Sequence, residues 1–297
     1  MKLFRRSSLL LAMLVSGACE RAKAPARADS PAAPKIVAAP DSSTTPPRNW
    51  DASAGPVLLI AAEAPTHAFV LLPDSANSAS QIAGLPQPAS VTLFGRSGTV
   101  QTAELPGVSD SGSCVVATLS AAPPPRPWSV GFIGGVVSPL TMDSTESIAR
   151  SDSLALVTGA TRLASALPND SAGRFAGLPF VVHGLWRFTI PSGPQVVIAT
   201  LVRQINQEAT PLQERTLLFA ERVASDTTLS TVYSERSSGD EETIETRDIL
   251  AAALLGATKT PAVVLSRDFG DSIAYALIER GADGRWRARW TSARRRC

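Results

Sequence analysis

The sequence is poor in the residues on which most enzymes and metal sites depend. Its 297 residues include only two histidines, His67 and His183, and three cysteines, and aromatic residues account for 5%. So few histidines leave little choice of general base or metal ligand. The sequence also lacks any apolar run near the roughly 20 residues that a membrane-spanning helix needs. The longest runs in its later part are Val57–Ala62 and Ile249–Leu255, so we expect a soluble body.

A strong charge of one sign is missing too. The formal net charge is +2, and lysine occurs only four times, so the positive charge is nearly all arginine. The run Arg294, Arg295 and Arg296 near the end is expected to be a solvated tail rather than a polymer-binding patch. We therefore expect no nucleic-acid partner. No segment repeats at a fixed period, which disfavours a solenoid.

The N-terminus has the pattern of an export signal. Lys2, Arg5 and Arg6 precede an apolar run from Leu9 to Val15, which is too short to span a bilayer but typical of a signal peptide. We assign residues 1–18 to this signal.

Four residues at the end of the signal resemble the lipobox of bacterial lipoproteins, namely Ser16, Gly17, Ala18 and Cys19. The resemblance implies that Cys19 is acylated and anchors the chain to a membrane, since two or more acyl chains hold a protein there stably. Ser16 departs from the pattern, which usually has leucine at that place. Cleavage after Ala18 without lipidation is the alternative.

Residues 19–55 have the composition of an extended linker. Large apolar residues are rare, and prolines recur among Ala, Ser and Thr at positions Pro25, Pro31, Pro34, Pro40, Pro46 and Pro47. Such a segment cannot bury a core, so we predict a Pro/Ala-rich disordered tether.

Residues 56–140 read as an N-terminal β-rich subdomain. Short runs of strand-forming residues are separated by clusters of Gly, Pro, Ser and Asp. Gly95 to Gly98 look like a hairpin turn. The predicted strands are Val57–Ala61, Ala68–Leu72, Ser90–Phe94, Val100–Leu105, Val115–Leu119 and Trp128–Ile133.

Residues 141–297 are predicted to form one helix followed by an antiparallel meander. The helix spans about 151–167, because Leu156, Ala160, Leu163 and Leu167 recur on one face and a proline follows. Its start is either at Ser151 as an N-cap or earlier, because Asp143 and Glu146 resemble a capping box.

Eight strands are predicted after the helix, joined by short turns. The fold class is mainly β, with the meander forming a curved sheet or partly closed barrel against which the helix packs; division into propeller-like blades is the alternative. The predicted strands are Val182–Ile190, Val196–Arg203, Thr216–Glu221, Thr231–Glu235, Thr243–Leu250, Ala262–Arg267, Ile273–Glu279 and Arg285–Trp290.

Cysteine usage suggests a disulfide. If Cys19 carries lipid, Cys114 and Cys297 remain as a pair in an oxidising compartment. We predict a bond between them, which would stabilise the fold by up to about 5 kcal/mol on the chain-entropy model. The alternative makes Cys114 a nucleophile with His67 or His183 as its base. Buried structural roles for Cys114 and His183 agree better with their positions in apolar strands.

Other catalytic and metal motifs fall short, so no catalytic residue, metal site or cofactor is assigned. Gly107 to Ser111 approach the Gly-x-Ser-x-Gly nucleophile motif but end in serine, and we expect a loop there. Leu156 to Arg162 resemble the nucleotide loop of short-chain dehydrogenases, without the later glycines that phosphate binding needs. Asp240 to Glu242 and the pair Asp268 and Asp271 are expected to be solvated turn charges.

Four tryptophans fall in predicted strands of both halves: Trp128, Trp186, Trp286 and Trp290. Inward aromatic residues are usually core. If some of them line a concave mouth instead, they form a binding surface with nearby arginines.

These patterns together predict a membrane-anchored, extracytoplasmic lipoprotein of the cell envelope. Its β-rich body is expected to act by binding or by a structural role, with a protein or envelope polymer as partner. An envelope hydrolase with an unidentified acid or serine centre, or a carrier of apolar ligands, are the alternatives.

Overall fold

The computed structural model describes residues 57–62, 64–71, 88–110, 114–134, 136–168, 173–206, 211–222 and 228–295. The chain divides into two units, Met1–Thr44 and Thr45–Cys297, and all described residues belong to the second. The predicted signal, the tether, Cys19 and Cys297 lie outside the described residues. Within the described ranges no helix has the length and apolar character needed to cross a membrane.

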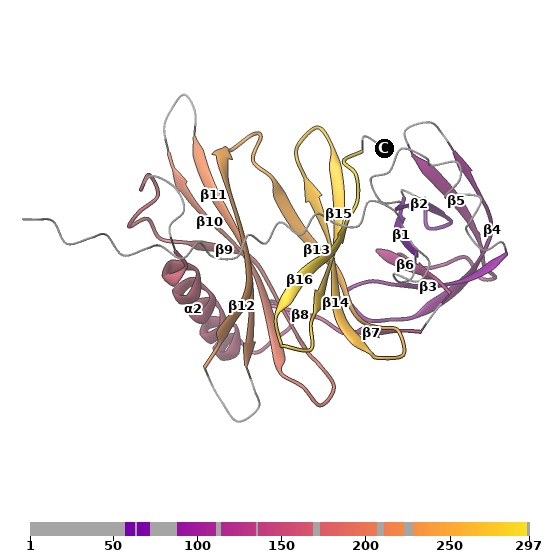
Figure 1. The fold of residues 1–297 in the computed structure, drawn as a ribbon, viewed down its shortest axis with the longest axis horizontal. Helices are drawn as coiled ribbons and strands as arrows, with labels where there is room; N and C mark the ends of the chain where they lie inside the picture. Colours follow the sequence, from indigo (N-terminus) through magenta and orange to yellow (C-terminus); the bar gives the residue numbers. More distant parts are fainter. Residues whose placement is uncertain are drawn as a thin grey trace, which may run out of the picture. The chain divides into compact units, whose positions relative to one another are not determined.

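The described part of the chain is mainly β with one helix, as the sequence predicted, and its first six strands close into an antiparallel barrel (Figure 1). The order around the barrel is β1-β2-β5-β4-β3-β6. Alternate residues of each strand fill the interior, where Leu59, Val91, Leu93 and Leu105 are fully buried. The strands are β1 (Val57–Ala61), β2 (His67–Val70), β3 (Ala89–Phe94), β4 (Gln101–Asp110), β5 (Val115–Ser120) and β6 (Val130–Ile133).

The remaining strands form two five-stranded sheets. The central sheet has the order β16-β15-β14-β13-β7, and the helix-side sheet has the order β12-β11-β10-β9-β8. The strand pairings in both sheets are antiparallel, and most join neighbours in the sequence. The strands are β7 (Val137–Leu140), β8 (Asp143–Ser144), β9 (Val181–Thr189), β10 (Gln195–Ile205), β11 (Leu212–Arg222), β12 (Ser230–Asp240), β13 (Thr246–Leu255), β14 (Thr260–Asp268), β15 (Ile273–Arg280) and β16 (Trp286–Thr291).

The central sheet is buried on both faces. Val263 and Leu265 of β14 face the helix-side sheet, whereas Ala262 and Val264 pack with Phe94 and other barrel residues. The described part of the second unit is therefore layered as helix, helix-side sheet, central sheet and barrel (Figure 1). Burial on both faces explains why the middle strands are continuous apolar runs rather than alternating ones.

The single described helix, α2 (Arg150–Ala166), packs on the outer face of the helix-side sheet through Leu156, Ala160 and Ala164. It begins after Ala149, which makes no side-chain cap, so the predicted cap at Ser151 is wrong. The earlier start is wrong too, because Asp143 belongs to β8. There it accepts a hydrogen bond from Arg187 of β9, which favours strand pairing over a capping box.

Two details of the predicted layout differ from the structure. The barrel forms from the N-terminal strands rather than from the meander, which divides into sheets instead. The barrel strands end at Ile133, and β7, which was not predicted, crosses to pair with β13 of the central sheet. Strand β7 is only four residues long and contains Pro139, so its sequence gives little strand signal.

Candidate functional site

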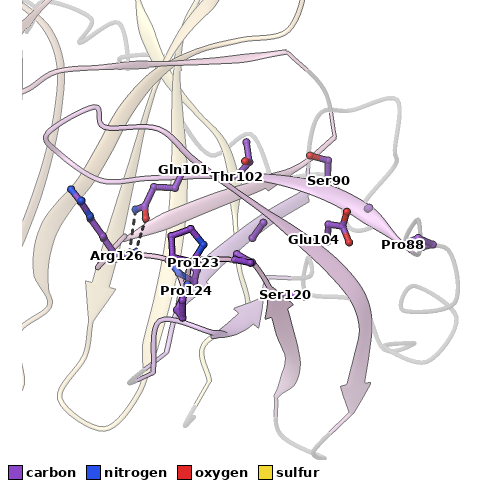
Figure 2. Close-up of a pocket in the computed structure, with 14 residues that line it drawn as sticks. Pro88, Ser90, Gln101, Thr102, Glu104, Ser120, Pro123, Pro124 and Arg126 are labelled. Carbon is purple, nitrogen blue, oxygen red and sulfur yellow. Dashed lines mark hydrogen bonds between the residues drawn. The ribbon is translucent and has the colours of Figure 1, made fainter.

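A groove on the barrel has a volume of about 930 Å³ (Figure 2). One part of it follows β3 and β4, and the other is the segment 121–126 that leaves β5. We call this segment the arch. The groove is lined by Pro88, Ala89, Ser90, Gln101, Thr102, Ala103, Glu104, Ser120, Ala121, Ala122, Pro123, Pro124, Pro125 and Arg126.

The arch bends away from β4 because it contains more residues than β4 does between the same two points of contact. Glu104 of β4 pairs with Ser120 at one end. At the other end the Gln101 side chain accepts a hydrogen bond from the Arg126 N–H at 2.6 Å and donates one to the Arg126 carbonyl at 3.2 Å. Between these two contacts the arch has five residues, 121–125, whereas β4 has two, 102 and 103. The longer segment must bow away, which opens the groove.

Proline chemistry prevents the arch from pairing with β4. Pro123, Pro124 and Pro125 have no N–H to donate to a strand ladder. Pro106 of β4 also lacks an N–H to donate. It lies at a bulge between Glu104 and Gly107, where pairing with β5 is interrupted. Of the described strands, only β3 therefore pairs with β4 between Gln101 and Ala103.

The groove combines polar side chains with alanines and prolines and carries one charge of each sign. Glu104 and Arg126 are exposed and lie toward opposite ends of it (Figure 2). Neither forms an ion pair with another described residue. Ser90, Thr102 and Ser120 add exposed hydroxyl groups, and none of the lining residues is aromatic. Such a surface can bind a polar ligand of low net charge.

A second polar cluster lies between the two sheets, at β12, β13 and β14. The Tyr233 hydroxyl donates to Glu235, and the Arg247 guanidinium lies 3.3 Å from Glu235 and 2.9 Å from Glu245. Arg267 donates to Glu245 at 2.5 Å. Two arginines thus neutralise two carboxylates, and the cluster joins the sheets rather than offering an unpaired acid or base.

The pKa shifts in this cluster follow from burial and from these partners. Burial, with the neighbouring Glu235 carboxylate, raises the pKa of Tyr233 well above its usual value. Burial alone would lower the pKa of the Arg267 guanidinium. Its hydrogen bond to Glu245 and the charge of Glu235 outweigh burial and raise it. Both residues therefore stay protonated at neutral pH.

Two further buried carboxylates are also paired. Glu221 of β11 accepts hydrogen bonds from Arg280 at 2.7 Å and from the Trp286 indole at 2.7 Å, which links the two sheets. On the helix side, fully buried Glu214 lies 2.9 Å from Arg203 and 3.3 Å from Arg236. Breaking such buried pairs is costly, because it leaves a buried charge without its partner.

Cys114 is buried and disulfide-bonded, so it is not a free nucleophile in this structure. Cys114 is the one cysteine within the described ranges, and the pairing with Cys297 stays a prediction. His67 and His183 are both exposed, so the expected buried role of His183 is wrong. In β2, which carries His67, and in β9, which carries His183, other residues occupy the buried positions.

The other predicted motifs occupy structural positions. Gly107 to Asp110 belong to β4, so the expected loop is wrong, and Ser109 lies in a strand rather than at a strand-to-helix turn. The dehydrogenase-like stretch Leu156–Arg162 lies inside α2. Within the described ranges, no group of three His, Cys, Asp or Glu side chains is placed to hold a metal ion.

The four tryptophans do not share a surface. Trp128 lies in the barrel interior, Trp286 between the sheets and Trp290 between the central sheet and the barrel, and all three are buried. Trp186 is half-buried beside the Arg96 guanidinium, 5.2 Å from the ring centroid. These side chains are core residues, so the binding surface considered for them is wrong.

Sequence reasoning missed the groove because its residues are ordinary strand and loop residues. The signal that could have found it is the distribution of proline: Pro106 within a strand and Pro123–Pro125 directly after one. Comparisons of the chain with protein-family models, with curated proteins and with solved structures find no match.

Proposed function

We propose that the protein is a cell-envelope lipoprotein, anchored through Cys19, whose β-rich body binds a partner in the barrel groove. The observation that carries the binding role is the groove itself, a cavity of about 930 Å³ with exposed polar residues and a charge of each sign. The lipobox-like residues Ser16 to Cys19 support the anchor. Among the described residues, the buried carboxylates Glu214 and Glu221 are paired with arginines, which favours binding over catalysis.

The packed barrel gives no support to a carrier of apolar ligands. A carrier needs an interior that side chains leave unfilled. Here Leu59, Val91, Leu93, Leu105 and their neighbours occupy the interior as one buried cluster. The groove lies beside this interior and is lined by polar and small residues instead.

Labelling with a click-reactive fatty acid tests the anchor. Wild-type protein should take up label and fractionate with membranes, because an acylated cysteine holds the chain there. Cys19→Ala should lose both properties. Ser16→Leu, which restores the usual lipobox residue, is the matched control and should keep both. Equal labelling of wild type and Cys19→Ala, or none in either, would exclude the lipid anchor.

A photo-crosslinking amino acid in the groove tests the binding role in the same cells. Replacing Thr102 should give discrete adducts of higher mass after irradiation, because this exposed residue lines the groove. Thr189, an exposed threonine of β9, is the matched position and should give none of these adducts. Identical patterns at both positions would contradict a partner in the groove.

A further inference from the structure

We propose that the partner binds the proline segment Pro123–Pro127 as a rigid polyproline II ligand, through aromatic side chains that also donate hydrogen bonds. This inference rests on the proposed binding role and names the chemistry of the partner, a protein surface that presents tryptophan or tyrosine. It follows from the conformation of the segment, from its exposed edges and from its carbonyl groups.

The sequence Pro-Pro-Pro-Arg-Pro restricts this segment to an extended conformation. Each proline ring holds its own φ at about −65°, and a proline also disfavours helical backbone in the residue before it. Pro123, Pro124 and Arg126 each precede a proline, so their backbones favour the polyproline II region. The peptide bonds within the segment are trans, as this helix requires.

The burial pattern agrees with a helix of this kind. Pro125 and Trp128, three positions apart, are buried, whereas the other residues of the segment are exposed. Polyproline II has three residues per turn, so positions three apart share an edge. The edge that contains Pro125 faces the barrel, where Trp128 belongs to the core. The other two edges, each made of two exposed residues, face outward.

The carbonyl groups of the segment favour a partner that donates hydrogen bonds. Pro123, Pro124 and Pro125 have no N–H, so their backbone can only accept. Their carbonyl groups accept no hydrogen bond from any residue within the described ranges. A partner with N–H or O–H groups can therefore bond to them without disturbing the barrel. A β-strand is a poor partner, because the prolines offer it no donor in return.

The proline rings favour aromatic side chains in the partner. Pro-rich segments bind aromatic-lined surfaces well, because a preformed polyproline II helix loses little chain entropy on binding. None of the groove's lining residues is aromatic, so the rings must come from the partner. Pro123 and Pro124 line the groove (Figure 2), whose volume of about 930 Å³ has room for such a ring. A tryptophan indole meets both requirements, since it combines an apolar ring with one N–H.

Two small aromatic probes test the inference with full-length protein in detergent. Indole has a ring and an N–H, whereas 1-methylindole has the ring without the donor. In nuclear magnetic resonance titrations, both should shift the amide resonances of Ala122 and Arg126. Indole should bind at least about threefold more tightly, as expected for one neutral hydrogen bond. The free probe concentration is measured by equilibrium dialysis, because the two probes partition differently into micelles.

A proline substitution gives the second readout. Pro124→Ala removes an outward ring and should weaken indole binding at least about threefold. Pro191→Ala, at an exposed proline between β9 and β10, is the matched control and should bind as wild type does. If Pro124→Ala alters the circular dichroism, Pro127→Ala takes its place, because it removes the other ring of the same edge. Equal affinity for the two probes, shifts absent from the arch, or unchanged binding by the substituted segment would each overturn the inference.

Photo-crosslinking at Thr102 separates this inference from the proposed function. The adducts should decrease when Pro124→Ala is combined with the crosslinker. Adducts of unchanged yield would leave the binding role and remove the proline segment as the ligand. Loss of fatty-acid labelling would remove the anchor and leave the probe titrations unchanged.

Discussion

At the scale of single residues, the space between the central sheet and the helix-side sheet contains polar side chains that are bonded to one another. Tyr233 packs its ring against Phe219, with centroids 5.3 Å apart, while its hydroxyl donates to Glu235. The carboxylate in turn faces Arg247 and Arg267. The hydroxyl proton is therefore part of the packing, and its removal should weaken the folded state.

This gives a prediction for stability at alkaline pH. Below about pH 10, the usual pKa of tyrosine, the Tyr233 hydroxyl is protonated in both the folded and the unfolded chain. Above it the unfolded chain ionises first, because the pKa of Tyr233 is raised in the fold. The free energy of unfolding should then fall by at most about 1.4 kcal/mol per pH unit for this group.

Urea unfolding between pH 9 and pH 11.5 measures the effect. Tyr233→Phe keeps the ring and removes the titration, so its stability should fall less steeply with pH than that of wild type. Burial also raises the pKa of Tyr275, which titrates in both proteins and so does not affect the comparison. An identical slope in the two proteins would contradict the assignment to Tyr233.

At the scale of elements, much of the strand pattern is readable from the sequence, because strands end where Gly, Pro and Asp cluster. The hairpin turn at Gly95–Gly98 was predicted and is confirmed, with the Gly98 N–H bonded to the Gly95 carbonyl at 3.0 Å. The faces of β16 were not predictable. Strict alternation would place Trp286 and Trp290, four residues apart, on one face, but a bulge at Arg289 turns them into different cores. The position of a bulge cannot be read from the two-residue alternation of a single strand, because it depends on how that strand pairs with its partner.

The choice of which strands close into a barrel was not readable either. Closure depends on pairings between distant strands, such as β1 with β6 and β3 with β6. The groove depends on this long-range pairing, because it forms only where β4 and the arch lie side by side. Local patterns predict strands, whereas long-range pairing decides the site.

The arch makes an element-scale prediction. Gln101→Ala removes both hydrogen bonds to the Arg126 backbone, so the arch should open more easily at that end. Amide hydrogen exchange at Arg126 should accelerate roughly tenfold, as expected for the loss of about 1 to 2 kcal/mol of local stability. Thr102→Ala, a neighbour on β4 without a bond to the arch, should leave the exchange unchanged. Unchanged exchange in Gln101→Ala would mean that the arch is held elsewhere.

At the scale of the whole molecule, the central sheet couples the other layers. Its β14 residues contribute to the core shared with the helix-side sheet and to the core shared with the barrel. Loss of this sheet would expose apolar surface on both neighbours, so we expect the barrel and the sheets to unfold in one transition.

Single-tryptophan variants test this expectation. Trp128 reports on the barrel interior and Trp286 on the space between the sheets. With the remaining tryptophans replaced by phenylalanine, denaturant midpoints of the two fluorescence signals should coincide with each other and with the loss of β-sheet circular dichroism. A separate midpoint for Trp128 would show that the barrel unfolds independently.

The way the arch is fixed has a consequence for how this surface could change over time. Its two ends are set by the pair Glu104 and Ser120 and by the Gln101 side chain, and neither depends on the identity of residues 121–125. The exposed positions 122–124 can be rewritten while the barrel keeps its closure, whereas Ala121 packs against the barrel core and Pro125 is buried. The groove is thus a place where selection, or a library of loop variants, can alter specificity at little risk to the rest of the fold.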